Sequence, residues 1–192
     1  LSVLPATKNI YDAVFLGRLV PSKGIYDIAP IWRRVCDHLP GARLAIVGSG
    51  SEMVIRKLTD IFLENDLQNN IDLLGYLSSQ EIYAMLKCAR AFIFPSHEEG
   101  FGIAIVEAMA CGTPVLAWNL PVYKGLFEGG IISVPQGDFA VFTELLLPLL
   151  SCETKQNSEL ISQGHRLAKN YSWSKVSQKM QSWLLGISSE SK

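Results

Sequence analysis

Short apolar runs alternate with longer stretches in which apolar residues recur at helical spacing. The long stretch that follows the first run, for example, has Ile28, Ile31, Trp32 and Val35 on one side. Alternation of this kind predicts βαβ units, and hence an α/β, Rossmann-like, doubly wound parallel sheet of about six strands with helices on both faces. The runs expected to form the strands are Asp12–Leu16, Ala42–Val47, Ile71–Leu74, Ala91–Phe94, Val115–Trp118 and Ile131–Val134.

Helices are expected between and after these strands. Asn119–Glu128 is expected to form a short helix or a loop, and Asp138 is a candidate N-cap for the helix that follows it. The pattern places one domain in residues 10–186, between a linker at 1–9 and a polar tail at 187–192. The expected helices are Ile25–His38, Glu52–Glu64, Ser78–Cys88, Ile103–Cys111, Phe139–Leu147, Glu153–Lys169 and Trp173–Leu185.

Composition narrows the class of protein. The 192 residues carry a net charge of −1 and no long basic run, which disfavours a nucleic-acid or membrane-surface partner. The four cysteines form no CxxC pair, so free core thiols in a reducing, cytoplasmic setting are expected and a metal site is not. No apolar stretch has the length of a membrane span, and no signal peptide is evident. Because residue 1 is Leu and every methionine is internal, a fragment or processed chain is expected.

The richest segment is Phe94–Val115, FPSHEEGFGIAIVEAMACGTPV. A strand ends at Pro95, a polar turn leads into Gly100-Phe101-Gly102, and a helix opens at about Ile103. The unpaired N–H groups and the positive dipole end of that helix then lie at the carboxyl end of a parallel strand. A phosphate is the anion that such a site most often binds.

Two carboxylates flank this site, Glu99 before the helix and Glu107 about one turn inside it. They could form a glycosidase-like acid/base pair. Alternatively, Glu99 caps the helix and Glu107 lies on its flank. In a third interpretation, one carboxylate binds ribose hydroxyls and the other faces a sugar.

Basic residues follow the first strand. Arg18 and Lys23 lie in the loop after that strand, at the same edge of the sheet as the helix start. An arginine fork and a lysine point charge suit a diphosphate, although two solvated surface charges would give the same pattern.

Two further motifs carry weaker signals. Gly48-Ser49-Gly50 resembles half of a dinucleotide fingerprint, but Met53 replaces the third glycine of GxGxxG, which argues against NAD. His97 is a candidate base, although a loop histidine beside a Pro-Ser turn is more often structural or simply exposed.

Four motifs together, FLGRLVPSKG (15–24), ARLAIVGSG (42–50), the Phe94–Val115 segment and VPQGD (134–138), resemble the family-4 retaining glycosyltransferases. The resemblance covers about Ile10 to Leu185 and is to the C-terminal, donor-binding domain, one half of a GT-B fold. Glu99 and Glu107 match the E-x7-E element of that family.

The resemblance implies roles for individual residues. Arg18 and Lys23 would hold the donor diphosphate without a metal ion or other cofactor. Glu99 would contact the transferred sugar, and Glu107 would bind the nucleotide ribose. The remaining donor-binding positions implied are Gly17, Gly48, Gly75, Phe101, Gly102, Ile103 and Ala104.

The resemblance also implies a partner domain. Family members place the active site between two domains, so residues 1–9 would be the linker from a missing N-terminal acceptor domain. The expected function is donor binding for a retaining transferase that uses a nucleoside-diphosphate sugar, with no turnover by this chain alone. Any contact with the inner face of a membrane would come through the missing domain. A non-catalytic nucleotide-sugar-binding module and an NAD-dependent oxidoreductase are the alternatives.

Overall fold

The chain folds around one six-stranded sheet in which every neighbouring pair of strands is parallel. The computed structural model describes residues 11–151, 155–172, 174–178 and 180–182. The strand order is β3-β2-β1-β4-β5-β6, which confirms the predicted doubly wound sheet. The strands are β1 (Ala13–Leu16), β2 (Leu44–Val47), β3 (Ile71–Gly75), β4 (Ala91–Phe94), β5 (Val115–Trp118) and β6 (Ile132–Val134).

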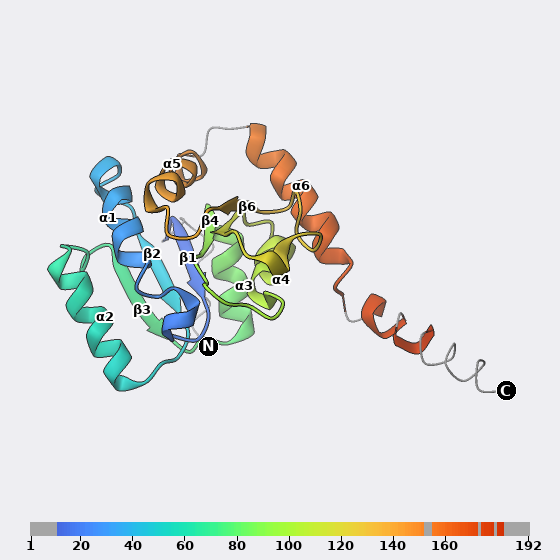
Figure 1. Cartoon of the computed structure of the whole chain (residues 1–192), viewed down its shortest axis with the longest axis horizontal. Coiled ribbons are helices and arrows are strands. Elements are labelled where there is room, and N and C mark those ends of the chain that lie inside the picture. Colours follow the sequence, from blue (N-terminus) through green and yellow to red (C-terminus); the bar gives the residue numbers. More distant parts are fainter. Residues whose placement is uncertain (1–10, 152–154, 173, 179, 183–192) are drawn as a thin grey trace.

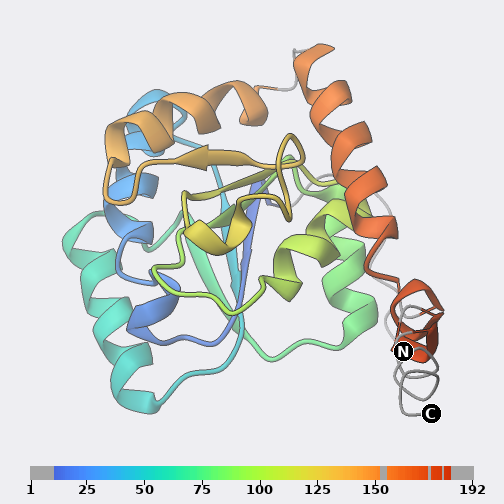
Figure 2. The ribbon, with the colours of Figure 1, turned by 45° about the vertical axis from the view of Figure 1, so that its right-hand side comes forward.

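Helices cover both faces of the sheet (Figures 1 and 2). On one side lie α1, α2 and α5, with α5 packed against α1, and on the other lie α3 and α4, with α6 packed on α4. The helices are α1 (Ile28–His38), α2 (Glu52–Glu64), α3 (Ser79–Cys88), α4 (Ile103–Cys111), α5 (Phe139–Leu150) and α6 (Lys155–Lys169).

Two helix boundaries differ by three residues from those predicted. Helix α1 begins at Ile28 rather than Ile25, because Gly24 adopts a left-handed conformation and ends a preceding 3-10 turn. Helix α5 continues through Pro148 to Leu150, three residues beyond the predicted end. Proline removes one helical N–H, but burial of Leu149 and Leu150 against the core favours the continued helix.

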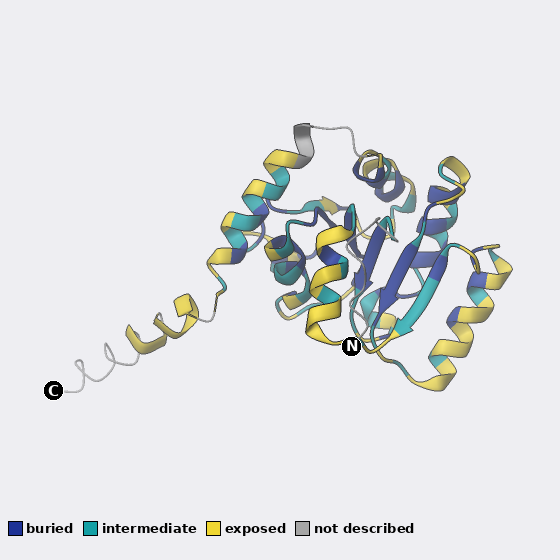
Figure 3. Cartoon of the chain, turned by 180° about the vertical axis from the view of Figure 1, so that it is seen from behind, coloured by how far each residue is buried: buried dark blue, intermediate teal, exposed yellow. Residues whose placement is uncertain are grey.

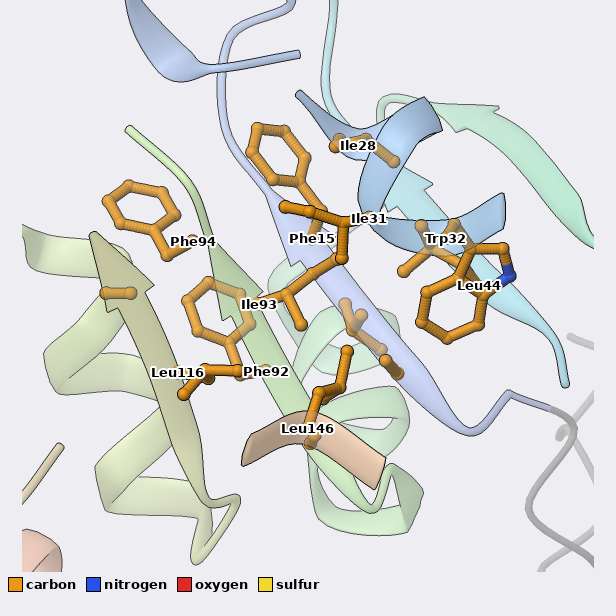
Figure 4. Packing of buried hydrophobic residues seen from close by; sticks show 14 of the residues in the cluster. Phe15, Ile28, Ile31, Trp32, Leu44, Phe92, Ile93, Phe94, Leu116 and Leu146 are labelled. Carbon is orange, nitrogen blue, oxygen red and sulfur yellow. The ribbon is translucent and has the colours of Figure 1, made fainter. Parts of the chain in front are cut away.

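The core lies on both faces of the sheet, and Figure 4 shows the part of it between the sheet and α1 with α5. Buried residues at helical spacing on α1 and α5 pack on the aromatic and aliphatic side chains of the central strands. Residues drawn in this packing are Phe15, Ile28, Ile31, Trp32, Leu44, Phe92, Ile93, Phe94, Leu116 and Leu146.

Strands β2, β4 and β5 are buried at every position, whereas α2 and α3 expose most of their outer surface (Figure 3). Helices cover both faces of this parallel sheet, so the side chains on both faces of its strands are buried. The strands are therefore continuous apolar runs in the sequence. The expectation of core thiols is wrong for Cys88, which lies exposed at the end of α3, whereas Cys36 is buried.

Several predictions lie outside the described residues: the linker at 1–9, the tail at 187–192, and Trp173. The described stretches 174–178 and 180–182 are helical, as expected, and Val176 and Met180 are exposed on them. Within the part of the chain that the structure describes, no helix is both long and apolar enough to cross a membrane.

Candidate functional site

The candidate site lies where β1 and β4 end side by side. β1 pairs with β2 on one side and with β4 on the other, so the connections from β1 and from β4 leave toward opposite halves of the sheet. Ligands of doubly wound sheets bind at this switch point, beyond the carboxyl ends of the strands.

Three of the predicted glycines meet at this edge. Gly48 donates its backbone N–H to the carbonyl of Gly75 at 2.8 Å, and Gly17 donates to Val47 at 3.0 Å. Gly48 has φ of +144°, and a Cβ on it would lie 1.8 Å from the Gly17 carbonyl oxygen. Only glycine allows the loops after β1 and β2 to approach this closely.

The loops after β1 and β4 are joined through their backbones. The carbonyl oxygen of Ser22 accepts hydrogen bonds from the His97 N–H at 2.9 Å and from the hydroxyl of the buried Ser96 at 3.1 Å. A Cβ on Gly24 would lie 1.7 Å from the Pro95 carbonyl oxygen, so this position also requires glycine. The two loops therefore form one surface.

Lys23 and Glu99 meet on that surface. The Lys23 ammonium forms an ion pair with a carboxylate oxygen of Glu99, and their side chains are 16% and 9% exposed. The same ammonium lies 3.5 Å from the Glu98 carbonyl oxygen and 5.9 Å from the centre of the Phe94 ring. The largely buried pair places a positive and a negative charge at the carboxyl edge of the sheet.

Arg18 lies on the same edge with its side chain exposed. Among the described residues, its guanidinium group has no ion pair or hydrogen bond to another side chain. All five of its N–H donors are thus available to a ligand that reaches this edge.

Helix α4 begins at the same edge. Its N-cap, Gly102, has φ of +97° and supplies no side-chain cap, so the interpretation that Glu99 caps this helix is wrong. The first turn leaves the N–H groups of Ile103 and Ala104 without acceptors inside the helix. Ile103 is 68% exposed at the helix tip, which leaves the tip accessible to an anion.

Aromatic rings pack against the glycine turn, Gly100–Gly102, that precedes α4. Phe101 packs edge-on against Phe127 and Tyr171, with ring centres 5.8 and 5.0 Å apart. The hypothetical Cβ of Gly102 would lie 3.4 Å from the ring of Tyr123. The turn that precedes α4 is therefore held by residues from the β5–β6 connection and from the end of α6.

Tyr123 belongs to this aromatic support and was not singled out from the sequence. Tyr123 is 3% exposed, and its buried hydroxyl has no hydrogen-bond partner among the residues that the structure describes. Burial, and then the negative charge of Glu99, raise the pKa of Tyr123 above its ordinary value. No sequence signal marks this residue, because its proximity to the site depends on the path of the β5–β6 connection.

Glu107 lies one turn into α4 and accepts a hydrogen bond from the Tyr83 hydroxyl of α3 at 3.3 Å. Its negative charge is the main cause of the raised pKa of Tyr83. Glu107 also lines a groove of about 760 Å³ that runs between α3 and α6 over α4 and includes Lys87 and Lys169. Neither Lys23 nor Glu99 lines this groove, so the two carboxylates do not form a facing pair in it.

His97 is bonded through both ring nitrogens. Its Nε2 lies 2.7 Å from a carboxylate oxygen of Asp27, and its Nδ1 lies 2.6 Å from the amide nitrogen of Gln136. The same oxygen of Asp27 accepts a hydrogen bond from the indole N–H of Trp118 at 2.9 Å. The four residues come from four different segments of the chain, so the sequence contained no signal for their meeting.

Metal ligands are not gathered at this edge. Across residues 11–151 and the described stretches after them, no three His, Cys, Asp or Glu side chains come together as a metal site would require.

Comparison with known proteins places the fold among glycosyltransferases. The family model for "Glycosyl transferases group 1" matches residues 3–185. The phosphatidyl-myo-inositol mannosyltransferase of Mycobacterium leprae is 31% identical over 167 residues, which are 85% of this chain and 43% of that protein. The glycogen synthase of Mycobacterium tuberculosis is 28% identical over 86% of this chain and 40% of that protein. The chain thus spans about two fifths of the length of these relatives.

Solved structures agree on the fold. HepE of Anabaena, in complex with UDP and glucose, superimposes with a TM-score of 0.81 at 21% identity, over 92% of this chain and 48% of that chain. TarM of S. aureus, in a complex that contains UDP, superimposes with a TM-score of 0.78 at 21% identity, over 94% of this chain and 36% of that chain.

Proposed function

The chain belongs to the glycosyl transferases group 1 family, and on that premise we propose that it is the donor-binding domain of a retaining glycosyltransferase that uses a nucleoside-diphosphate sugar. The observation that carries the proposal is the meeting of Lys23, Glu99 and the start of α4 at the switch point of the sheet. It provides a cation, a carboxylate and a helix N-terminus within one open edge.

The diphosphate of the donor would bind to the cations and to the helix. Arg18 has free donors at the edge of this surface, and Lys23 can move from Glu99 to a phosphate oxygen. The N–H groups of Ile103 and Ala104 and the helix dipole favour the same anion. Because these groups stabilise negative charge on a departing diphosphate, the proposed transfer needs no metal ion.

The two carboxylates would divide the rest of the donor between them. Glu99, next to Lys23, would contact the transferred sugar near the reacting carbon. Glu107, one turn further along α4, would accept hydrogen bonds from the ribose hydroxyls and exchange them for the bond from Tyr83. Gly48 packs on the Gly17 carbonyl and donates its N–H to Gly75, and the nucleotide would lie across the loops that these three glycines join.

The comparisons support this choice of ligand. HepE carries UDP and glucose, and TarM carries UDP, in structures with the same fold. Since this chain spans about two fifths of its relatives, the acceptor contacts would come from a further domain, and the chain by itself would bind donor without transferring sugar.

Calorimetry with UDP, GDP, ADP and NAD tests the proposal. We expect at least one nucleoside diphosphate to bind and NAD to bind weakly, because GxGxxG is broken at Met53. Binding of NAD with no binding of any nucleoside diphosphate would identify an oxidoreductase-like domain instead. Donor binding without transfer by the full-length protein would point to a non-catalytic nucleotide-sugar-binding module.

A further inference from the structure

His97 is the centre of a polar network that the proposed function leaves without a role. The network consists of His97 after β4, Asp27 before α1, Trp118 at the end of β5 and Gln136 after β6. Its hydrogen bonds measure 2.6–2.9 Å, and the Asp27 side chain is only 16% exposed. The network therefore connects four segments around the carboxyl edge of the sheet.

The hydrogen bonds indicate which nitrogen of the His97 imidazole donates and which accepts. An amide nitrogen can only donate, so Gln136 donates to Nδ1 and Nδ1 accepts. Nε2 then carries the hydrogen and donates it to Asp27. Both nitrogens of the His97 imidazole are engaged in hydrogen bonds, which leaves no free nitrogen to act as a base.

The position of His97 connects this network to the Lys23–Glu99 pair. His97 is two residues before Glu99 in the loop after β4, and Asp27 is four residues after Lys23 in the segment after β1. Between them, the His97 N–H donates to the Ser22 carbonyl oxygen at 2.9 Å. A shift of His97 would therefore displace the loop that carries Glu99 relative to the loop that carries Lys23.

We propose that His97, hydrogen-bonded to Asp27, is a positioning residue that holds the loops of Lys23 and Glu99 in register for a bound diphosphate. The inference rests on the proposed function, since it assigns His97 to the same site. Trp118 fixes the Asp27 carboxylate from the core, and Gln136 fixes the far side of the ring from the loop after β6. The imidazole acts through the loop backbone and does not touch the ligand.

Binding of inorganic pyrophosphate to the full chain, measured by calorimetry, tests this role. His97→Leu removes both hydrogen bonds and should weaken binding about tenfold, which corresponds to one or two lost hydrogen bonds. His97→Gln can keep the bond to Asp27 through its amide nitrogen and should retain affinity within about threefold. His38→Leu is the matched control, because His38 is exposed at the end of α1 and should leave binding unchanged.

A double variant separates positioning from general structural damage. In a Lys23→Met background, His97→Leu should cause no further loss, because the group that His97 positions has already been removed. If His97→Leu lowers pyrophosphate affinity by the same factor in the Lys23→Met background as in the unaltered chain, the proposal is contradicted. An equal loss of pyrophosphate affinity in His97→Gln and His97→Leu would also contradict it.

The remaining outcomes are also decisive. If His97→Leu does not fold, Gln136→Leu provides the test, since it removes only the bond to Nδ1 at an exposed position and should weaken binding about threefold. Unchanged pyrophosphate affinity in the variants, with binding by the unaltered chain, overturns this inference alone. Failure of the unaltered chain to bind pyrophosphate or any nucleoside diphosphate overturns the proposed function and this inference with it.

Discussion

At the residue scale, the ammonium group of Lys23 contacts Glu99, so a diphosphate that binds Lys23 competes with that carboxylate. Arg18 has no such competitor, because its side chain is exposed and has no protein partner among the described residues. The two cations should therefore contribute differently to binding.

We expect Arg18→Ala and Lys23→Ala each to weaken pyrophosphate binding by about 1–3 kcal/mol, the scale of a charge-assisted hydrogen bond. The loss should be larger for Lys23, because its removal also leaves the Glu99 charge unpaired beside the ligand. Calorimetric titration measures both, with Lys124→Ala as an exposed control.

Replacing Glu99, the carboxylate paired with Lys23, should have the opposite effect on pyrophosphate binding. Glu99→Gln removes the competitor for Lys23 and should strengthen pyrophosphate binding, provided that Lys23 binds the anion. Weaker pyrophosphate binding in Glu99→Gln, or unchanged affinity in both cation variants, would exclude the pair from the diphosphate site.

Glu107→Gln should separate ribose from diphosphate recognition. The neutral amide is a weaker acceptor for ribose hydroxyls, so binding of the preferred nucleoside diphosphate should weaken by about 1 kcal/mol or more. Pyrophosphate has no ribose and should bind unchanged. An equal loss for both ligands would contradict the ribose role of Glu107.

The buried hydroxyl of Tyr123 gives a prediction about stability. Because that hydroxyl has no partner, Tyr123→Phe should raise the free energy of unfolding by about 1 kcal/mol. The folded pKa of Tyr123 exceeds the unfolded value of about 10, so its contribution to stability is lost as pH rises above about 10. Tyr123→Phe should therefore lose less stability than the unaltered chain in alkaline urea unfolding.

Tyr76→Phe is the matched control, because Tyr76 is 84% exposed. This substitution should change neither the free energy of unfolding at neutral pH nor its decrease in alkali. A large destabilisation by Tyr123→Phe at neutral pH would show that the hydroxyl is bonded after all.

At the scale of elements, helix starts at the carboxyl edge differ in how they are capped. At α3 the Ser78 hydroxyl accepts from the Glu81 N–H and the Glu81 carboxylate accepts from the Ser78 N–H, a complete capping box, whereas α4 begins at Gly102 with no side-chain cap. A side-chain cap satisfies part of the free N–H groups of a helix start, while an uncapped start keeps them for a ligand. Helices α4 and α1 share an uncapped start, in contrast to α2, α3 and α5, and the exposed tip of α4 makes it the candidate for the anion-binding helix.

The capping box of Ser78 and Glu81 predicts that the stability contributed by the start of α3 depends on pH. Hydrogen bonds from Ser78 lower the pKa of Glu81, so the stabilisation from this carboxylate is present above the ordinary glutamate pKa and is lost as pH falls through the folded value. Ser78→Ala should lower the free energy of unfolding by about 1 kcal/mol at neutral pH. The difference in the free energy of unfolding between Ser78→Ala and the unaltered chain should become smaller in acid.

Urea unfolding at neutral pH and at about pH 3 measures the deficit. Ser79→Ala is the control, since Ser79 is exposed at the first position of α3 and does not cap it. Equal effects of the two substitutions would mean that the capping box adds nothing to stability.

At the scale of the molecule, the strand order brings the site together. β1 and β4 are neighbours in the sheet, although α1, β2, α2, β3 and α3 lie between them in the chain. Lys23 and Glu99, 76 residues apart, meet because each follows one of these two strands. The same neighbourhood explains why the Ser22 carbonyl oxygen, after β1, accepts hydrogen bonds from His97 and Ser96, after β4.

Metal independence is a prediction about the whole molecule. Since Arg18, Lys23 and the α4 dipole would neutralise the diphosphate, EDTA should leave the affinity for the preferred nucleoside diphosphate unchanged. Calorimetry with and without EDTA, and with added Mg²⁺, measures this. A loss of affinity in EDTA that Mg²⁺ restores would require a metal ion in the donor complex.

The sequence by itself determined the six strands, nearly all helix positions, the doubly wound class and the edge at which Glu99 and the start of α4 lie. Hydrophobic periodicity reports local burial, and glycine, proline and capping residues mark the ends of elements, so these features need no knowledge of distant contacts.

Only the tertiary structure decided which side chains meet. Strand order and loop paths joined Lys23 to Glu99, surrounded His97 with Asp27 and Gln136, and placed the Tyr123 hydroxyl beneath the glycine turn. They also placed Glu107 beside Tyr83 in a groove that Glu99 does not line. Such partners come from segments far apart in the chain, and local periodicity carries no information about that pairing.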